Sequence, residues 1–311
     1  MRYTVRDKSL YSFVIFVFSA VIYITYLFYD HENQLETEWR KEVGLYKKSE
    51  IKKIAPNALL LGGSNVAYSL SANQLTTSTK YSWYNLGLPS EAFNDQNYWN
   101  YVSTSLSYEQ RMNVELIVYS GFAPFSSGYL AARSKDSSDS WGNRNLHLIP
   151  NNTLASVLKN VLLRSDYKMY FTNPNQYPLP ISRGDFNFNK MNCDKYNYIP
   201  RAFDREMDWK IVEAWVAFQV FKIAVTFPKA ELVFVTPSVF YGETYDLDAD
   251  NAYAAQLASL IQDQSNSKVN FLAQPPYLEK NITCDRPHHS NREGRVWRTN
   301  NLSMFLSSMN E

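Results

Sequence analysis

The sequence is poor in the residues that build metal centres and disulfide frameworks. Its 311 residues include only two cysteines and four histidines, too few for a zinc finger or a compact cluster of ligands. Charge of one sign is also lacking, because 31 basic and 30 acidic residues leave a net charge of +1 and imply no polyanionic partner. No glycine-rich phosphate loop and no basic stripe with aromatic residues occurs. We expect no cofactor, no metal and no nucleic-acid partner.

Charged residues are absent from one long stretch near the N-terminus. Residues 10–29 contain no Asp, Glu, Lys or Arg, and a helix of this length spans about 30 Å, the thickness of a bilayer's hydrocarbon core. Residues 1–9 are mainly basic and acidic residues follow the stretch, which predicts a cytoplasmic N-terminus. A cleaved signal peptide is the alternative, but its apolar region is usually shorter and ends at small residues. We predict a single-pass anchor in the inner (cytoplasmic) membrane and a periplasmic or other extracytoplasmic C-terminal domain.

Composition divides the chain into four parts. After the cytoplasmic residues 1–9 and the anchor at 10–29, residues 30–55 carry many charges of mixed sign and predict a juxtamembrane helix or linker with a solvated face. Residues 56–311 are long enough for one domain with its own core. Apolar runs alternate there with helical segments, so we expect an α/β fold, a three-layer α/β/α sandwich with a mainly parallel sheet.

The expected elements of this domain can be placed along the chain. Strands are predicted at 58–61, 82–86, 114–119, 231–237 and 269–272, and helices at about 71–77, 91–106, 153–163, 209–227, 252–261 and 291–306. The segment 126–145 is predicted to be a loop. The long polar segment 166–200 is interpreted as a lid or substrate rim, because long loops in compact domains are usually functional or mobile.

The most informative stretch lies between Ala58 and Tyr68. An apolar run typical of a buried strand stops at Gly62 and Gly63, and Ser64 follows at once. Glycine allows the chain to leave the sheet sharply, so Ser64 would stand at the carboxyl end of a parallel strand, where open α/β sheets bind ligands. Ser64 is therefore a candidate nucleophile. The alternative is a loop serine that caps a helix.

A serine nucleophile needs a base, and two of the four histidines, His288 and His289, lie near the C-terminus. Asp285 precedes His288 by three residues across a turn stiffened by Pro287. Such an acid can orient an imidazole and stabilise its charged form, because the geometry of a triad does not depend on chain order. A metal site or a solvated loop is the alternative, and the shortage of further ligands disfavours the metal.

These residues resemble the SGNH (GDSL-like) hydrolases. Gly62-Gly63-Ser64-Asn65 looks like their first block, Asp285-x-x-His288 like their last block, and residues 84–89 like the second block, whose glycine is here Gly87. The resemblance implies a flavodoxin-like sandwich with Ser64, Asp285 and His288 as catalytic residues. It also implies an oxyanion hole that includes the backbone N–H groups of Ser64 and Gly87.

The third block departs from the family's pattern. Ala123 stands where the oxyanion asparagine of the family is expected. Losing one such donor typically costs about 10²–10³ in rate, so either Asn65 or Asn94 substitutes or the enzyme works with two donors. His289 is the alternative base, because its spacing to Gly294 also fits the family.

Cys193 and Cys284 are the only cysteines. In an exported domain they are candidates for a disulfide that would tie the segment around Cys193 to the segment just before Asp285. Spacing alone does not show whether the two residues approach each other.

Relatives of the SGNH family that are tethered by one N-terminal helix often move acyl groups onto or off cell-surface polymers. The resemblance thus implies a membrane-anchored O-acyltransferase, with acetyl as the expected group, that acts on exported polysaccharide and receives its acyl group from a membrane partner. A carbohydrate esterase of the same fold is one alternative. A non-catalytic polysaccharide-binding relative is the other, and Ala123 favours it.

Overall fold

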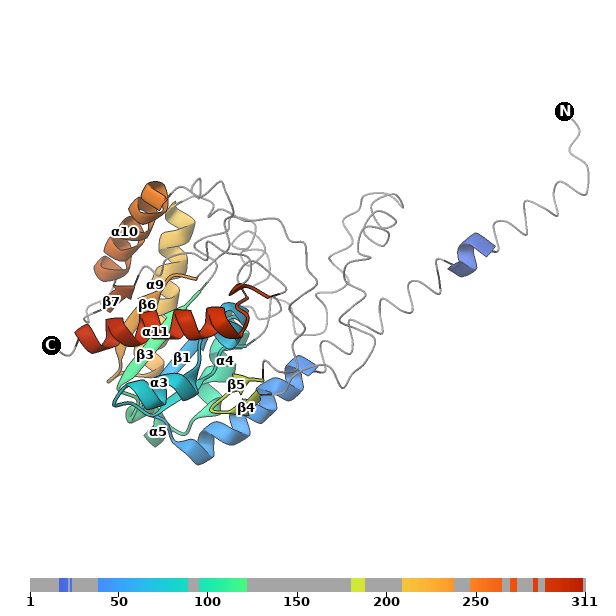
Figure 1. The fold of residues 1–311 in the computed structure, drawn as a ribbon, viewed down its shortest axis with the longest axis horizontal. Coiled ribbons are helices and arrows are strands. Elements are labelled where there is room, and N and C mark those ends of the chain that lie inside the picture. Colours follow the sequence, from blue (N-terminus) through green and yellow to red (C-terminus); the bar gives the residue numbers. More distant parts are fainter. Residues whose placement is uncertain are drawn as a thin grey trace, which may run out of the picture.

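The computed structural model describes residues 17–21, 23, 39–88, 95–121, 180–187, 209–237, 247–264, 269–272, 282–284 and 289–309. A five-stranded sheet lies at the centre of the domain (Figure 1). Its strands are β1 (Ala58–Gly62), β2 (Trp83–Asn85), β3 (Leu116–Ser120), β6 (Glu231–Val235) and β7 (Val269–Leu272). The five strands correspond to the five that the sequence predicts.

All neighbouring strands of this sheet are parallel, in the order β2-β1-β3-β6-β7. From β1 the chain passes first to β2 on one side and then to β3 on the other. This doubly wound order creates a topological switch point at the carboxyl ends of β1 and β3, where such folds bind ligands. The predicted parallel sheet is confirmed.

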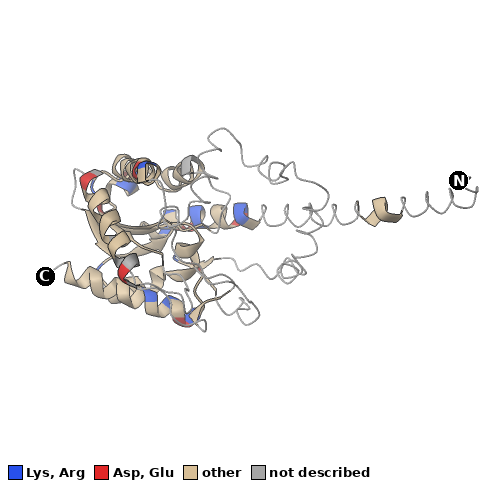
Figure 2. Ribbon diagram, turned by 90° about the horizontal axis from the view of Figure 1, so that it is seen from above, with Lys and Arg blue, Asp and Glu red and all other residues tan. Residues whose placement is uncertain are grey.

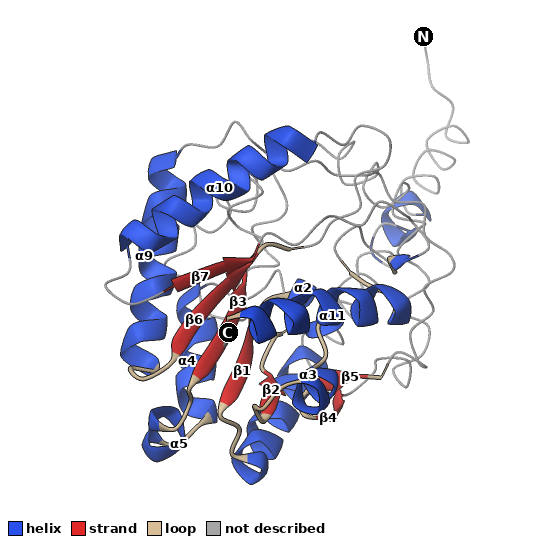
Figure 3. Cartoon of the chain, turned by 60° about the vertical axis from the view of Figure 1, so that its left-hand side comes forward, coloured by secondary structure: helices blue, strands red, loops and turns tan. Residues whose placement is uncertain are grey.

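Helices cover both faces of the sheet (Figure 3). One face packs against the helix over residues 39–54, α4 (Asp95–Ser105), α9 (Trp209–Thr226) and α10 (Leu247–Gln264). The other face packs against α3 (Ala72–Ser78) and α11 (Arg292–Ser308). Two short helices, α2 (Ser64–Ser69) and α5 (Tyr108–Met112), complete the described elements. The described elements thus form the three layers that the sequence predicts.

The strands are unbroken apolar runs because helices cover both faces of the sheet. Leu59 and Leu61 of β1 belong to the core on one face, whereas Ala58 and Leu60 belong to the core on the other. All four side chains are fully buried. A strand that is covered on both sides has no solvent face on which polar residues would alternate.

The helix over residues 39–54 packs along its length against the domain, although the sequence places a solvated juxtamembrane segment there. Trp39, Val43, Lys47 and Ile51 recur every fourth residue and are all buried. Residues four apart lie on the same side of a helix, so these side chains form one stripe. Except for Lys47, they belong to the main hydrophobic core.

A small hairpin is described within the long segment interpreted as a lid or rim. Strands β4 (Pro180–Ser182) and β5 (Asp185–Phe186) pair antiparallel. The two turn residues, Arg183 and Gly184, have φ values of 50° and 74°, as in the two-residue turns that suit β-hairpins. The rest of 166–200, the loop 126–145 and the helix at 153–163 lie outside the described residues.

Among the residues that the structure describes, no helix is both long enough and apolar enough to span a bilayer. Of the predicted anchor, residues 17–21 and 23 are described and are helical. Val17, Phe18, Val21 and Tyr23 are exposed there. The other residues of 10–29 lie outside the described residues, and the anchor stays a prediction.

Candidate functional site

Ser64 stands where the sequence places it, just beyond the carboxyl end of β1. Gly63 is the N-cap of α2 and Ser64 is its first residue, half-buried. Gly62 has a φ of 146°, and a Cβ there would overlap the carbonyl oxygen of Ser120 on β3. The Gly62 N–H also donates to the Tyr98 hydroxyl at 2.7 Å. Only glycine fits this exit from the sheet, and it directs Ser64 to the switch point.

Arg298 of α11 ties together the strand ends around this turn. Its Nη1 donates to the carbonyl oxygen of Asn65 at 2.7 Å, and its Nη2 donates to Ser120 Oγ and to the carbonyl oxygen of Thr236, both at 3.1 Å. The arginine is fully buried. The three acceptors follow or end β1, β3 and β6, so one guanidinium fixes three carboxyl ends relative to one another.

Asn65, named as a substitute oxyanion donor, faces inward. It is buried, and its Nδ2 donates to Ser120 Oγ at 2.9 Å. The amide therefore helps to hold β1 and β3 together next to Ser64, and this contact does not support the oxyanion role. Asn94, the other named substitute, lies outside the described residues.

Gly87 lies beside α2, but its N–H is engaged within the loop. It donates to Asn85 Oδ1 at 2.9 Å, and a Cβ on Gly87 would lie 2.7 Å from the backbone nitrogen of Ala67. The Leu88 N–H donates to the carbonyl oxygen of Gly62 at 3.1 Å. The second block thus packs on the turn that carries Ser64. The oxyanion role of Gly87 stays a prediction.

Lys47 holds the same loop from the side of the helix over residues 39–54. Its Nζ donates to the carbonyl oxygen of Gly87 at 2.6 Å and to that of Asn85 at 3.0 Å. The ammonium also lies 5.0 Å from the centre of the Phe186 ring. Burial lowers the pKa of Lys47 from 10.5 to about 7, against the opposing influence of Asp185 and Glu50.

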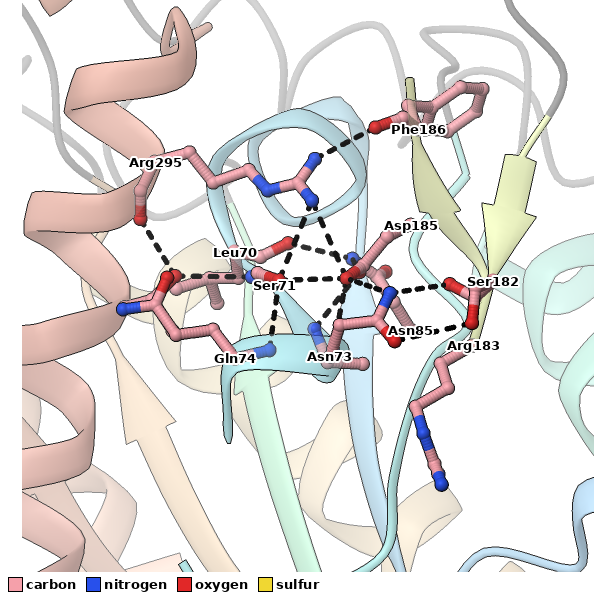
Figure 4. Close-up of polar contacts among 12 residues, drawn as sticks. Leu70, Ser71, Asn73, Gln74, Asn85, Ser182, Arg183, Asp185, Phe186 and Arg295 are labelled. Carbon is pink, nitrogen blue, oxygen red and sulfur yellow. Dashed lines mark hydrogen bonds and ion pairs between the residues drawn. The ribbon is translucent and has the colours of Figure 1, made fainter. Parts of the chain in front are cut away.

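Asp185 is the centre of a second polar cluster, drawn in Figure 4. Its carboxylate is fully buried and accepts hydrogen bonds from Ser71 Oγ at 2.8 Å and from the Ala72 and Asn73 N–H groups at 2.9 and 3.0 Å. Arg295 Nη2 lies 3.4 Å from Oδ2. The carboxylate thus supplies acceptors for the free N–H groups in the first turn of α3. It also joins the hairpin to α3 and α11.

The pKa of Arg295 is lowered by burial, and Asp185 opposes this shift. A guanidinium stays charged at any pH that a protein survives. Arg295 therefore keeps its charge beside Asp185.

The described residues that flank the last block contact α2. Thr283 and Ser290 form an antiparallel bridge, and the Cys284 N–H donates to the carbonyl oxygen of His289 at 2.7 Å. The Ser290 N–H donates to Ser69 Oγ of α2 at 3.1 Å. The residues on either side of Asp285 and His288 are thus joined at the end of α2, whereas Asp285 and His288 themselves lie outside the described residues.

His289 is buried, with its ring centre 4.7 Å from that of Tyr68. Tyr68 follows Ser64 by four residues and so lies on the same side of α2. Ser64 and His289 therefore share Tyr68 as a neighbour.

Two further predictions concern residues that are only partly described. Cys284 is buried and disulfide-bonded, while Cys193, the other cysteine of the sequence, lies outside the described residues. Ala123 lies outside them too. Within the described part of the chain, no group of three or more His, Cys, Asp or Glu side chains is placed to hold a metal ion. Charged residues are distributed over several elements (Figure 2).

Sequence reasoning missed Lys47, Asp185 and Arg298. For Lys47 the signal was its position in the stripe of Trp39, Val43 and Ile51. Arg298 likewise precedes the buried Leu302 by four residues on α11. Nothing local marks Asp185, because its partners lie about a hundred residues away along the chain.

No protein-family model and no curated protein matches the chain. Among solved structures, it is similar to an acetyl xylan esterase (Est2A) from the rumen bacterium Butyrivibrio proteoclasticus, with 8% sequence identity and a TM-score of 0.39. The similarity covers 81% of this chain and 63% of that one, so the chain spans less than two thirds of the esterase's length. A likeness this distant carries no argument about activity.

Proposed function

We propose that the chain is a serine-dependent acyl-transferring enzyme with Ser64 as its nucleophile. One observation carries the proposal. Ser64 is half-buried at the start of α2, at the switch point of a parallel sheet, and the C-terminal histidine segment packs against the same helix. Nucleophile and base would then meet from opposite ends of the chain.

The chemistry follows the logic of a serine triad. Ser64 Oγ attacks the carbonyl carbon of an acyl ester while His288 takes its proton, and Asp285 holds the imidazole. The tetrahedral intermediate collapses to an acyl-serine as the proton passes to the departing alcohol. A second hydroxyl then attacks the acyl-serine, gives its proton to the histidine, and restores Ser64. His289 remains the alternative base.

The oxyanion would be bound mainly by the Ser64 N–H at the start of α2. Neither the Gly87 N–H nor the inward-facing Asn65 amide supports such a role. Each missing donor typically lowers the rate by about 10²–10³. We therefore expect slow turnover of simple esters.

The proposed substrate is an exported polysaccharide, and the proposed acyl group is acetyl. Residues 10–29 would anchor the enzyme in the inner membrane and leave the domain outside the cytoplasm, where a membrane partner supplies the acyl group. A carbohydrate esterase that uses water as the acceptor shares the acyl-serine step and is the alternative.

A non-catalytic polysaccharide-binding protein is the second candidate function. It is favoured by the same engaged donors, Gly87 and Asn65, together with Ala123 in the asparagine position. A protein that only binds has no need of an oxyanion hole.

The test uses the full chain in detergent with p-nitrophenyl acetate, with and without an oligosaccharide acceptor. Acetyl groups found on the sugar support transfer, and release of p-nitrophenol that does not depend on the acceptor supports hydrolysis. Ser64→Ala should abolish either activity, whereas Ser307→Ala, at an exposed serine on α11, should leave it unchanged. Sugar binding without turnover in both the wild type and Ser64→Ala would overturn the enzymatic proposal in favour of the binder.

A further inference from the structure

Lys47 is a fully buried cation within the polar cluster beneath α2. Its described contacts are the carbonyl oxygens of Asn85 and Gly87 and the face of the Phe186 ring. No ion pair joins it to a described carboxylate, and the charged groups that act on it from a distance are Asp185 on β5, Glu50 on its own helix and Arg295 on α11. Burying an ammonium costs free energy, so a lysine at this position needs a role that an apolar side chain of similar size would not fill.

One chain of contacts leads from Lys47 to the nucleophile. The two carbonyl groups that it binds belong to Asn85, the last residue of β2, and to Gly87 in the loop that follows. The Asn85 side chain donates to the carbonyl oxygens of Val66 and Leu70 at 3.2 and 3.0 Å. These carbonyls belong to α2 and its C-cap. A helix of six residues is not stable alone, so the direction of α2, and of Ser64 at its start, depends on this loop.

A second chain of contacts leads from Lys47 to the histidine segment. The ammonium lies against the face of the Phe186 ring. The centre of this ring is 5.0 Å from the centre of the Tyr68 ring, which in turn is 4.7 Å from the centre of the His289 ring. Lys47 is therefore linked to α2 through Asn85, and to His289 through two residues, Phe186 and Tyr68.

The helix that carries Lys47 also holds the hairpin. Glu50 Oε1 accepts a hydrogen bond from the Arg183 N–H, and Glu50 Oε2 accepts one from the Gly184 N–H, both at 3.2 Å. Phe186, which covers Lys47, follows directly on β5. The helix over residues 39–54 thus fixes both the loop beneath α2 and the hairpin that lies over the ammonium.

From this geometry we infer that Lys47 is a positioning residue for Ser64, and that the helix over residues 39–54 is a required part of the catalytic unit. The inference rests on the proposed function for its catalytic meaning. Lys47 touches neither Ser64 nor a substrate; it acts by holding the Asn85–Gly87 loop against α2.

The test compares Lys47→Met and Lys47→Arg with two controls in the full chain. Lys47→Met keeps most of the side-chain length but cannot donate to the two carbonyls, whereas Lys47→Arg keeps donors and charge. Lys52→Met alters an exposed lysine of the same helix. Leu306→Ala removes a buried side chain on the opposite face of the sheet and controls for lost stability.

Ester turnover is the first readout. Lys47→Met should lower kcat on the order of 10-fold or more with little change in KM, because a displaced nucleophile loses rate rather than affinity. Lys47→Arg should recover part of kcat. Lys52→Met should match the wild type, and Leu306→Ala should lower the melting temperature without the loss in kcat. An unchanged kcat in Lys47→Met would overturn the inference.

Amide hydrogen exchange is the second readout and needs no activity. Exchange of residues 83–88 should speed up on the order of 10-fold in Lys47→Met, while β6 keeps its protection. Unchanged exchange at 83–88 overturns the positioning role. If the wild type turns over no ester, the proposed function fails, yet the exchange experiment still decides whether Lys47 holds the loop. Should Lys47→Met not fold, Lys47→Gln, which is shorter and uncharged, takes its place: faster exchange at 83–88 supports the inference and unchanged exchange contradicts it.

Discussion

Two buried cations come from helices on opposite faces of the sheet, and their contacts differ. Arg298 comes from α11 and binds Asn65 of α2, Ser120 at the end of β3 and Thr236 just after β6. Lys47 comes from the helix over residues 39–54 and binds two carbonyls of a single loop. Both side chains are fully buried. Arg298 therefore ties α2 to the ends of strands, whereas Lys47 holds a loop.

The two cations also differ in chemistry. A guanidinium presents a planar set of donors and keeps its charge, whereas an ammonium is a compact charge whose pKa falls readily on burial. Arg298 can therefore bridge three elements at every pH. Lys47, whose pKa burial lowers to about 7, is titratable near neutrality. Of these two cations, only Lys47 can change its charge near neutral pH.

The largest effect is expected at Gly62, on the Arg298 side. Gly62→Ala should destabilise the protein by about 4 kcal/mol or more, because the new Cβ would overlap the Ser120 carbonyl and the backbone has a positive φ. Gly63→Ala is the matched control, since a Cβ there would meet only Asn65 Oδ1 at 3.6 Å. Chemical denaturation measures both. Equal stability of the two variants would contradict the close approach of β1 and β3.

Arg298→Met should come next, with a loss of about 3 kcal/mol. The change leaves three buried acceptors, on Asn65 of α2, Ser120 of β3 and Thr236 after β6, to find other donors. Arg292→Met, at an exposed arginine of the same helix, should cost almost nothing. A stable Arg298→Met protein would show that the strand ends hold their positions without the guanidinium.

On the Lys47 side, Asp185→Asn should cost about 1–3 kcal/mol. An amide in place of the carboxylate turns an NH₂ group toward the Ser71, Ala72 and Asn73 donors and weakens the pair with Arg295. Asp263→Asn, at an exposed position of α10, is the control. Hydrogen exchange of residues 180–187 should rise only in Asp185→Asn, and no change there would break the account of the hairpin.

The smallest effect is a pH dependence that belongs to Lys47. Its pKa is about 7 in the folded chain and near 10.5 in the unfolded chain, so between these values the unfolded chain binds more protons. The free energy of unfolding due to this group should therefore rise with pH, on the order of 1 kcal/mol per pH unit, and be lost as pH falls toward 7.

The free energy of unfolding of the wild type and of Lys47→Met is measured between pH 6 and 10, roughly the window set by linkage. The difference between the two proteins at each pH gives the contribution of Lys47. The difference in the free energy of unfolding between the wild type and Arg298→Met should not change with pH over the same window. If the difference for Lys47→Met did not change with pH either, the contrast between the two cations would be lost.

Much of the fold follows from local pattern. The apolar runs of β1, β3 and β6 fit strands that are buried on both faces, and Asn291 caps α11 by accepting from the Gly294 N–H at 2.9 Å. The position of Ser64 after β1 follows in the same way. These features depend on residues that are close in sequence.

The supports of the site could not be predicted in this way. Lys47 and Glu50 sit among charges of mixed sign that predict a helix with a solvated face. The stripe of Trp39, Val43 and Ile51 marks the buried side of this helix, but only the contact with Asn85, 38 residues away, shows what Lys47 binds there. The bond from the Gly87 N–H to the Asn85 side chain is likewise invisible in the block that Gly87 belongs to. Contacts between distant segments decide such roles, and composition does not contain them.

The central claim is that folding makes Ser64 an activated nucleophile. The most direct measurement treats the folded full chain with a fluorophosphonate and maps the modified peptide by mass spectrometry. The account predicts a phosphonyl adduct on Ser64 that disappears in denatured protein and in Ser64→Ala. An unmodified Ser64, or equal labelling before and after denaturation, would contradict it.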